Sequence, residues 1–171
     1  MKLSPFQDAP THFAVTAETR VTEELEIEFR LTGPLGKLVI DPKSLFPERT
    51  KGLWEKTCFE IFFSLPGEKN YWELNLSPAG HWDLFRFESY RKGMQREERI
   101  ARLEVQTTKL THTLGLKTTL PVAELGLKNN KLEISATAVL QSRSLNYSYW
   151  AWKHAGDQPD FHLRESLIFQ A

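Results

Sequence analysis

The chain has 171 residues, of which 40% are hydrophobic and 26% are charged, and its 22 basic residues balance its 22 acidic ones. This size and composition are typical of one domain with its own hydrophobic core, so we predict a single domain over residues 1–171. Because a neutral chain lacks the positive field on which nucleic-acid binding depends, we expect no nucleic-acid partner.

Cellular context is indicated by features that the sequence lacks. Cys58 is the single cysteine, which excludes an internal disulfide bond. The N-terminal stretch MKLSPFQDAPTHF has no apolar core like that of a signal peptide. No apolar run approaches the roughly 20 residues that a membrane-spanning helix needs. We therefore expect a soluble, cytoplasmic protein with no membrane partner, and the sequence leaves its oligomeric state open.

The first third of the chain predicts strands with one solvated face. Residues 12–17 alternate between apolar and polar side chains, and residues 24–32 alternate almost without fault. In the second run, leucine, isoleucine and phenylalanine point inward, while Glu24, Glu26 and Glu28 point outward. We expect this acidic row to face water. Gly33-Pro34 ends the run, and residues 37–40 predict a short apolar strand.

The stretch of residues 53–94 holds three more alternating runs, at residues 57–63, 71–76 and 82–88. The links between these runs contain Pro-Gly or Ser-Pro-Ala-Gly and are too short for a crossover helix, so we expect antiparallel neighbours. In the third run we expect Phe85 and Phe87 to point inward. The predicted outward side chains of the three runs are Glu60, Tyr71, Glu73, Asn75, Trp82 and Arg86.

The second half of the chain predicts further strands and few helical residues. The charge-dense residues 91–102 are interpreted as a solvated loop, and PVAELGL at residues 121–127 as a single helical turn. The tail from residue 153 is expected to be irregular. The predicted strands span residues 103–109, 112–120, 132–140 and 147–152. About ten short alternating strands with Gly/Pro turns predict an all-β fold, either a single β-sandwich or a barrel.

Polar and aromatic side chains on the central strands are candidates for a ligand-binding face. Carboxylates, amides and arginines hydrogen-bond to sugar hydroxyls, and flat rings pack on the C–H faces of sugars. Glu60, Asn75, Arg86 and Trp82 supply these types, and the small Ser135 and Thr137 would leave room for a ligand. The alternative is the solvent side of a sheet whose charges pair across strands.

Three other groups of residues allow different chemistry. His154, Asp160 and His162 form the ligand set of a facial iron site, or they form a structural Asp–His pair in a loop that Pro159 holds. Met94 with a late histidine could serve as axial ligands for haem. Cys58 alternates with core residues, so we expect it to be buried and inert.

The chain resembles the DOMON-like proteins, a β-sandwich group similar to the family-nine carbohydrate-binding modules. The segments that carry the resemblance are LWEKTCFEIFF, YWELNLSPAGHWDLFRFESYRKGM, PVAELGL and YWAWKHAGDQPDFH. The resemblance implies a jelly-roll or immunoglobulin-like antiparallel β-sandwich that binds a sugar or haem and is usually not an enzyme. Sugar-binding modules carry a tryptophan followed by an acid pair. Trp54 and Glu60 match this pattern, and Thr57 stands at the intervening acid position.

We therefore predict a non-catalytic β-sandwich that binds a saccharide or glycan, with no cofactor and no metal. The alternatives are a haem-binding cytochrome-type DOMON domain and a metal-dependent enzyme that uses the His154/Asp160/His162 loop. In the favoured hypothesis the ligand stacks on Trp54, Trp82 and Trp152. It hydrogen-bonds to Glu60, Asn75 and Arg86. One rim of the site is shaped by the tail residues His154, Asp160 and His162.

Overall fold

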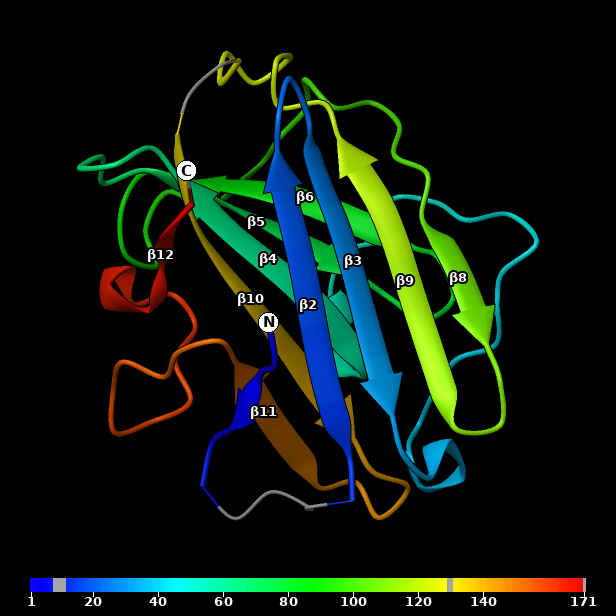
Figure 1. Ribbon diagram of the computed structural model, residues 1–171. Helices are drawn as coiled ribbons and strands as arrows, with labels where there is room; N and C mark the ends of the chain where they lie inside the picture. The colour runs from blue at the N-terminus through cyan, green and yellow to red at the C-terminus, as the bar shows by residue number, and fades with distance from the viewer. Residues whose placement is uncertain (8–11, 129–130, 171) are drawn as a thin grey trace.

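The computed structural model describes residues 1–7, 12–128 and 131–170. These residues form two antiparallel β-sheets that pack face to face, with the smaller sheet in front of the larger one in Figure 1. The prediction of an all-β, antiparallel sandwich is therefore confirmed. Within the described residues, no helix is long and apolar enough to cross a membrane.

The larger sheet has the strand order β1-β11-β10-β4-β5-β6-β7, and β12 also pairs with β10. The bounds of these strands, in sheet order, are β1 Ser4–Pro5, β11 Tyr147–Ala151, β10 Leu132–Gln141, β4 Cys58–Ser64, β5 Tyr71–Leu76, β6 Trp82–Phe87, β7 Gln95–Arg96 and β12 Ile168–Gln170. The smaller sheet has the order β2-β3-β9-β8, with bounds β2 Ala14–Val21, β3 Leu25–Thr32, β9 Thr113–Leu120 and β8 Gln106–Lys109.

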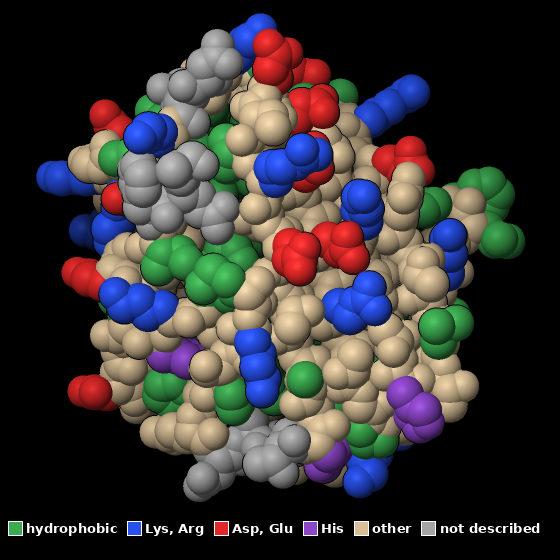
Figure 2. Space-filling model, in the orientation of Figure 1, with side chains coloured by type: hydrophobic (Ala, Val, Ile, Leu, Met, Phe, Trp, Pro, Cys, Tyr) green, Lys and Arg blue, Asp and Glu red, His purple; other side chains and the backbone are tan. Residues whose placement is uncertain are grey.

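The smaller sheet has one buried and one solvated face, as the alternation of its residues predicts. Leu25, Ile27 and Phe29 of β3 are buried against the larger sheet. The acidic row of β3 faces water, where Glu26 forms an ion pair with Arg20 at 2.6 Å. Figure 2 shows acidic and basic side chains next to one another on this face. It is a solvated sheet surface.

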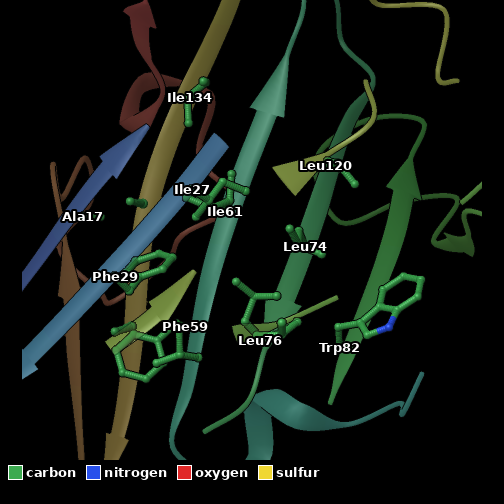
Figure 3. Close-up of a cluster of buried hydrophobic side chains, with 14 of the residues drawn as sticks. Ala17, Ile27, Phe29, Phe59, Ile61, Leu74, Leu76, Trp82, Leu120 and Ile134 are labelled. Carbon is green, nitrogen blue, oxygen red and sulfur yellow. The ribbon is translucent and has the colours of Figure 1, made fainter. Parts of the chain in front are cut away.

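The larger sheet differs from the smaller one because its central strands are buried on both faces. Every residue of β4 and of β5 is buried. The inner face packs on the smaller sheet through side chains such as Phe59, Ile61 and Leu74, which Figure 3 shows between the two layers. The outer face carries a second, mainly aromatic cluster that includes Phe62 and the tail residue Phe161. The C-terminal segment therefore covers part of the outer face.

The side chains of β6 point to the opposite faces of the sheet from those predicted. Leu76 pairs with Trp82 in the β5–β6 register, and directly opposed residues in an antiparallel pair point to the same face. Trp82 therefore points into the inner core (Figure 3), and Phe85 and Phe87 point to the outer face. The intervening turn fixes this register, because Ser77 N–H donates to His81 O (2.9 Å) and Gly80 adopts a φ of 93°.

Three further expectations differ in detail from the structure. The strand predicted at residues 37–40 is instead the short 3₁₀ helix η1 (Leu35–Lys37) followed by a single bridge between Leu38 and Ser142. The helical turn predicted at residues 121–127 forms as consecutive hydrogen-bonded turns. The tail is irregular to residue 163, as expected, but then forms η3 (Arg164–Ser166) and β12.

Candidate functional site

A cavity of about 420 Å³ lies on the outer face of the larger sheet. Its floor comes from alternate residues of β4, β5, β6 and β10, which point away from the smaller sheet. Its walls come from three segments outside these strands: the 3₁₀ helix η2 (Leu53–Glu55), the loop that follows β6, and the tail after β11. The volume lies in the range of small-molecule sites in proteins.

Two glutamates form the polar part of the floor. Glu60 of β4 and Glu73 of β5 are 3% and 5% exposed. Glu60 is paired with Asn75 across the two strands, so Glu73 is its diagonal neighbour on the same face. Thr137 Oγ1 donates to Glu60 Oε2 (2.9 Å), and Asn75 Nδ2 donates to Glu73 Oε1 (2.9 Å). The two acids are therefore held in place by neutral partners.

Burial raises the pKa values of both carboxyl groups. Removal from water, together with the negative charge of Glu73, raises the pKa of Glu60 to about 8. The pKa of Glu73 is raised to about 7, again mainly by removal from water. Both acids consequently titrate near neutral pH, where a ligand can change their charge.

His162 closes the cavity from the tail as a neutral imidazole. Its Nδ1 lies 2.8 Å from the hydroxyl of Tyr71, which also accepts a hydrogen bond from Arg91 N–H (3.2 Å). In the tautomer in which Tyr71 OH donates to Nδ1, the ring hydrogen of His162 is on Nε2. Burial, with a smaller contribution from the Arg91 charge, lowers the pKa of His162 to about 4. Nε2 lies 4.0 Å from Glu73 Oε2, too far for a direct hydrogen bond.

Aromatic rings make up most of the remaining wall. Tyr71 and Phe87 stack with ring centroids 4.8 Å apart, and Phe87 meets the His162 ring edge-on at 5.2 Å. Trp54, which also lines the cavity, packs edge-on against Phe85 at 5.7 Å. Trp54 is carried by η2, which begins directly after Gly52 with a φ of 82°. Such walls present flat, apolar surfaces to a ligand.

An ion pair joins the two segments that form the rim. Arg91 Nη2 donates to Asp160 Oδ1 (2.9 Å), and Tyr90 OH also donates to Asp160. Burial alone would raise the pKa of Asp160, but the hydrogen bonds from Tyr90, from the His162 backbone and from Arg91 lower it. Arg91 has a φ of 52°, an uncommon conformation for a residue with a side chain. The loop after β6 and the tail are thus fastened to each other beside the cavity.

The structure brings five of the nine predicted site residues to this region. Trp54, Glu60 and His162 line the cavity itself. Asn75 and Asp160 lie beside the cavity and contact residues that line it: Asn75 donates a hydrogen bond to Glu73, and Asp160 accepts one from Arg91.

Trp82 and Arg86, which were predicted to point outward beside Glu60, lie on the inner side of β6. Trp82 is 3% exposed within the core, and the Arg49 guanidinium lies 5.1 Å from its ring. Arg86 pairs with the core residue Trp72 in the β5–β6 register and borders a separate hollow. Neither lines the cavity, because the register of β6 sets their direction.

Trp152 and His154 also lie elsewhere. Trp152 packs against the inner core. The Nε2 atom of His154 is hydrogen-bonded to Ser4 O (2.9 Å), and its ring contacts Phe6. His154 therefore lies apart from Asp160 and His162, which are joined by a hydrogen bond from the His162 backbone N–H to Asp160 Oδ1 (3.0 Å). Within the described residues no cluster of His, Cys, Asp or Glu has the form of a metal site.

Several cavity residues were not among the predicted site residues. Glu73 was expected on the outward face but given no role, and Met94 was considered only as a haem ligand. Both line the cavity. The others are Phe62, Phe87, Arg91, Val139, Tyr149, Pro159 and Phe161. The signal that could have found Phe87 is the length of the turn before β6, which places Phe87 on the same face as Tyr71.

A second hollow of about 480 Å³ lies at another edge of the sandwich, beside Lys37, Leu140 and Tyr147. His12 and Phe13 also line it. Its lining includes neither of the buried glutamates. The cavity above Glu60 and Glu73 is therefore the stronger candidate site.

No protein-family model matches the chain, and no curated protein matches it in sequence. Solved structures match in fold. A candidate carbohydrate-binding protein from Bacteroides uniformis ATCC 8492 superposes with a TM-score of 0.69 at 12% identity, covering 98% of this chain and 84% of that one.

A family-nine carbohydrate-binding module from Caldicellulosiruptor kristjanssonii in complex with glucose gives a TM-score of 0.52 at 11% identity, covering 88% of this chain and 72% of that one. The same kind of module in complex with cellotriose gives 0.50 at 11% identity, covering 84% and 67%. At these identities the likeness establishes a shared β-sandwich fold.

Proposed function

We propose that this protein is a non-catalytic saccharide-binding β-sandwich whose site is the cavity above Glu60 and Glu73. The observation that carries this proposal is the combination of two buried carboxyl groups on the floor with aromatic rings on the walls. A sugar ring has apolar C–H faces and polar hydroxyl edges, so it needs both kinds of surface at once.

Each part of the cavity has a role in this proposal. Phe87 and Trp54 would contact the C–H faces of a sugar, because both are aromatic residues that line the cavity. Glu60 and Glu73 would bind hydroxyl groups, as donors when protonated and as acceptors when ionised. His162 Nε2–H would donate a further hydrogen bond.

The fold supports the same conclusion. The neighbouring structures of this sandwich include modules that hold glucose and cellotriose. The resemblance of the chain to DOMON-like proteins, which rests on the segments around Trp54, Glu60 and His162, belongs to this proposal as well. Together they favour a binding module over an enzyme.

The experiment is isothermal titration calorimetry with glucose, cellotriose and a broader panel of glycans. Wild-type protein is expected to bind at least one of them. Phe87→Ala is expected to weaken that binding by about tenfold, because loss of a buried aromatic contact is worth roughly 1–3 kcal/mol. Phe46→Ala is the matched control, since Phe46 is 84% exposed and does not line the cavity. Absence of binding across the panel contradicts the proposal.

A haem-binding domain is the second candidate, because Met94 and His162 line the same cavity. The surroundings fit haem less well than they fit a sugar. The ring nitrogen of His162 that is not bonded to Tyr71, Nε2, lies 4.0 Å from the carboxyl group of Glu73, which occupies the space in front of it. Reconstitution with haem distinguishes the two candidates. A Soret band that Met94→Ala abolishes supports haem binding, whereas a protein that takes up no haem rules the haem-binding candidate out.

A further inference from the structure

We propose that the saccharide bound here carries a protonated amino group, which lies against Glu60 and Glu73 on the cavity floor. This inference rests on the proposed function, because it names the class of sugar that the same site takes. It follows from the charges, the free oxygen atoms and the rings of the cavity.

The first step is the number of hydrogen bonds to the two acids. Glu60 Oε2 accepts from Thr137, whereas its Oε1 has no hydrogen-bond partner among the described residues, although Glu60 is only 3% exposed and lines the cavity. Glu73 Oε1 accepts from Asn75, and the nearest donor to its Oε2 is His162 at 4.0 Å. One oxygen of each acid is thus available to a ligand.

The second step is that neither acid forms an ion pair with a lysine or arginine of the described residues. Arg49 and Arg96 both form ion pairs with Asp83, each at 2.7 Å. Arg91 on the rim is paired with Asp160 at 2.9 Å. Its charge lowers the pKa of Glu73 and that of Asp83 raises it, but Arg91 forms no ion pair with Glu73 among the described residues.

The remaining titratable groups do not supply the missing charge. On the tail, His162 is neutral near pH 7 because its pKa is lowered to about 4. On β4 and β5, burial raises the pKa values of Cys58 and Tyr71, which keeps both protonated. Two buried carboxylates without a cation are unfavourable. A cationic ligand would supply the partner that the protein omits.

The third step is the aromatic lining. A protonated amine is attracted to the face of an aromatic ring as well as to carboxylates. Phe62 and Phe87 lie on the same face of the sheet as the two acids, and Trp54 faces them from η2. This surface also fits the C–H faces of a sugar ring, so an amino sugar uses both parts of the site.

Binding of such a ligand is coupled to proton release. In the empty cavity the raised pKa values keep Glu60 and Glu73 largely protonated near pH 6.5. When the ammonium group binds, a carboxyl group gives its proton to solvent, and the carboxylate pairs with the ammonium group. A neutral sugar needs no such ionisation. The two ligand classes therefore differ in the protons that they release.

The experiment compares three trisaccharides by calorimetry: a glucosamine trimer, its N-acetylated counterpart and cellotriose. It is run at about pH 6.5, where an amine with a pKa of roughly 7.7–8 is mostly protonated. The glucosamine trimer is expected to bind about tenfold or more tightly than the other two, because a buried ion pair discriminates strongly. In buffers of different ionisation enthalpy, it alone is expected to release protons.

Matched variants locate the effect. Glu60→Gln keeps the shape of the side chain and is expected to remove the preference and the proton release, while Glu68→Gln, at an exposed position, leaves both unchanged. Equal binding of the three sugars overturns the inference and leaves saccharide binding in place. Absence of binding by all three overturns the amino-sugar inference too, and with a negative glycan panel it also overturns the proposed function. A preference for the glucosamine trimer that survives in both Glu60→Gln and Glu73→Gln also overturns the inference that the amino group lies against these two acids.

Discussion

Glu60 stands at a position where a sheet normally places an apolar side chain. It lies in the middle of β4, flanked on the same face by Thr137 of β10 and Asn75 of β5. Its two neighbours are neutral, and among the described residues no lysine or arginine forms an ion pair with it; the hydrogen bond from Thr137 offsets only part of the effect of burial on its pKa. Stability is therefore expected to depend on the protonation of this residue.

The first prediction concerns pH. The pKa of Glu60 rises from 4.5 to about 8 on folding, so between these values the folded state binds protons that the unfolded state has lost. The free energy of unfolding should then fall as pH rises through this window. The raised pKa of Glu73 adds to the same trend. The lowered pKa of His162 acts in the opposite direction, but only between about 4 and 6.5.

Glu60→Gln is expected to flatten this dependence above about pH 6.5. At pH 9 the variant should unfold at a higher urea concentration than wild type, because its free energy of unfolding should be higher by about 1–3 kcal/mol. Urea unfolding followed by circular dichroism at several pH values measures this, with Glu68→Gln as the control. A difference between variant and wild type that stays constant with pH contradicts the prediction.

At the scale of elements, the rim of the site depends on contacts between two irregular segments. The loop after β6 and the tail after β11 meet through the Arg91–Asp160 ion pair and through Tyr90. Neither segment belongs to a sheet at that point, so side-chain contacts rather than a backbone ladder hold them together. Segments of this kind open at low free-energy cost.

The second prediction is that Asp160→Asn loosens the tail without unfolding the sandwich. The substitution removes the charge that pairs with Arg91, so amide hydrogen exchange at residues 153–163 should become faster. The urea midpoint should change little, because partly exposed ion pairs contribute roughly 0–1 kcal/mol. Asp157→Asn is the control, since Asp157 is exposed on the same segment. Unchanged exchange in Asp160→Asn would falsify this role for the ion pair.

At the scale of the molecule, the larger sheet separates two apolar clusters with different tasks. The inner cluster joins the two sheets and contains Trp82, whereas the outer cluster underlies the cavity and contains Phe87. Both residues come from β6 and both are 3% exposed. Their effects on folding and on binding should nevertheless differ, because they point to opposite faces.

The third prediction compares these two residues directly. Trp82→Ala is expected to lower the free energy of unfolding by about 3–5 kcal/mol, as large-to-small changes in a core do, and to leave the affinity of the folded fraction unchanged. Phe87→Ala is expected to weaken ligand binding. Urea unfolding and calorimetry on each variant measure both effects. An affinity loss in Trp82→Ala equal to that in Phe87→Ala contradicts the assignment of the two faces.

The sequence by itself determined the longer strands of both sheets and which residues share a face within each of them, whereas the short strands β1, β7 and β12 were not predicted. Alternation with a period of two is local, so the outward positions of Glu60 and Glu73 and the solvated acidic row of β3 could be predicted from neighbouring residues alone. Tertiary structure decided the rest. The facing of Trp82 and Phe87 depends on the register that the turn after β5 imposes. The placing of His162 and Phe161 over Phe62 depends on the return of a distant tail to the sheet. These contacts join residues far apart in the chain, and no local pattern encodes such distances.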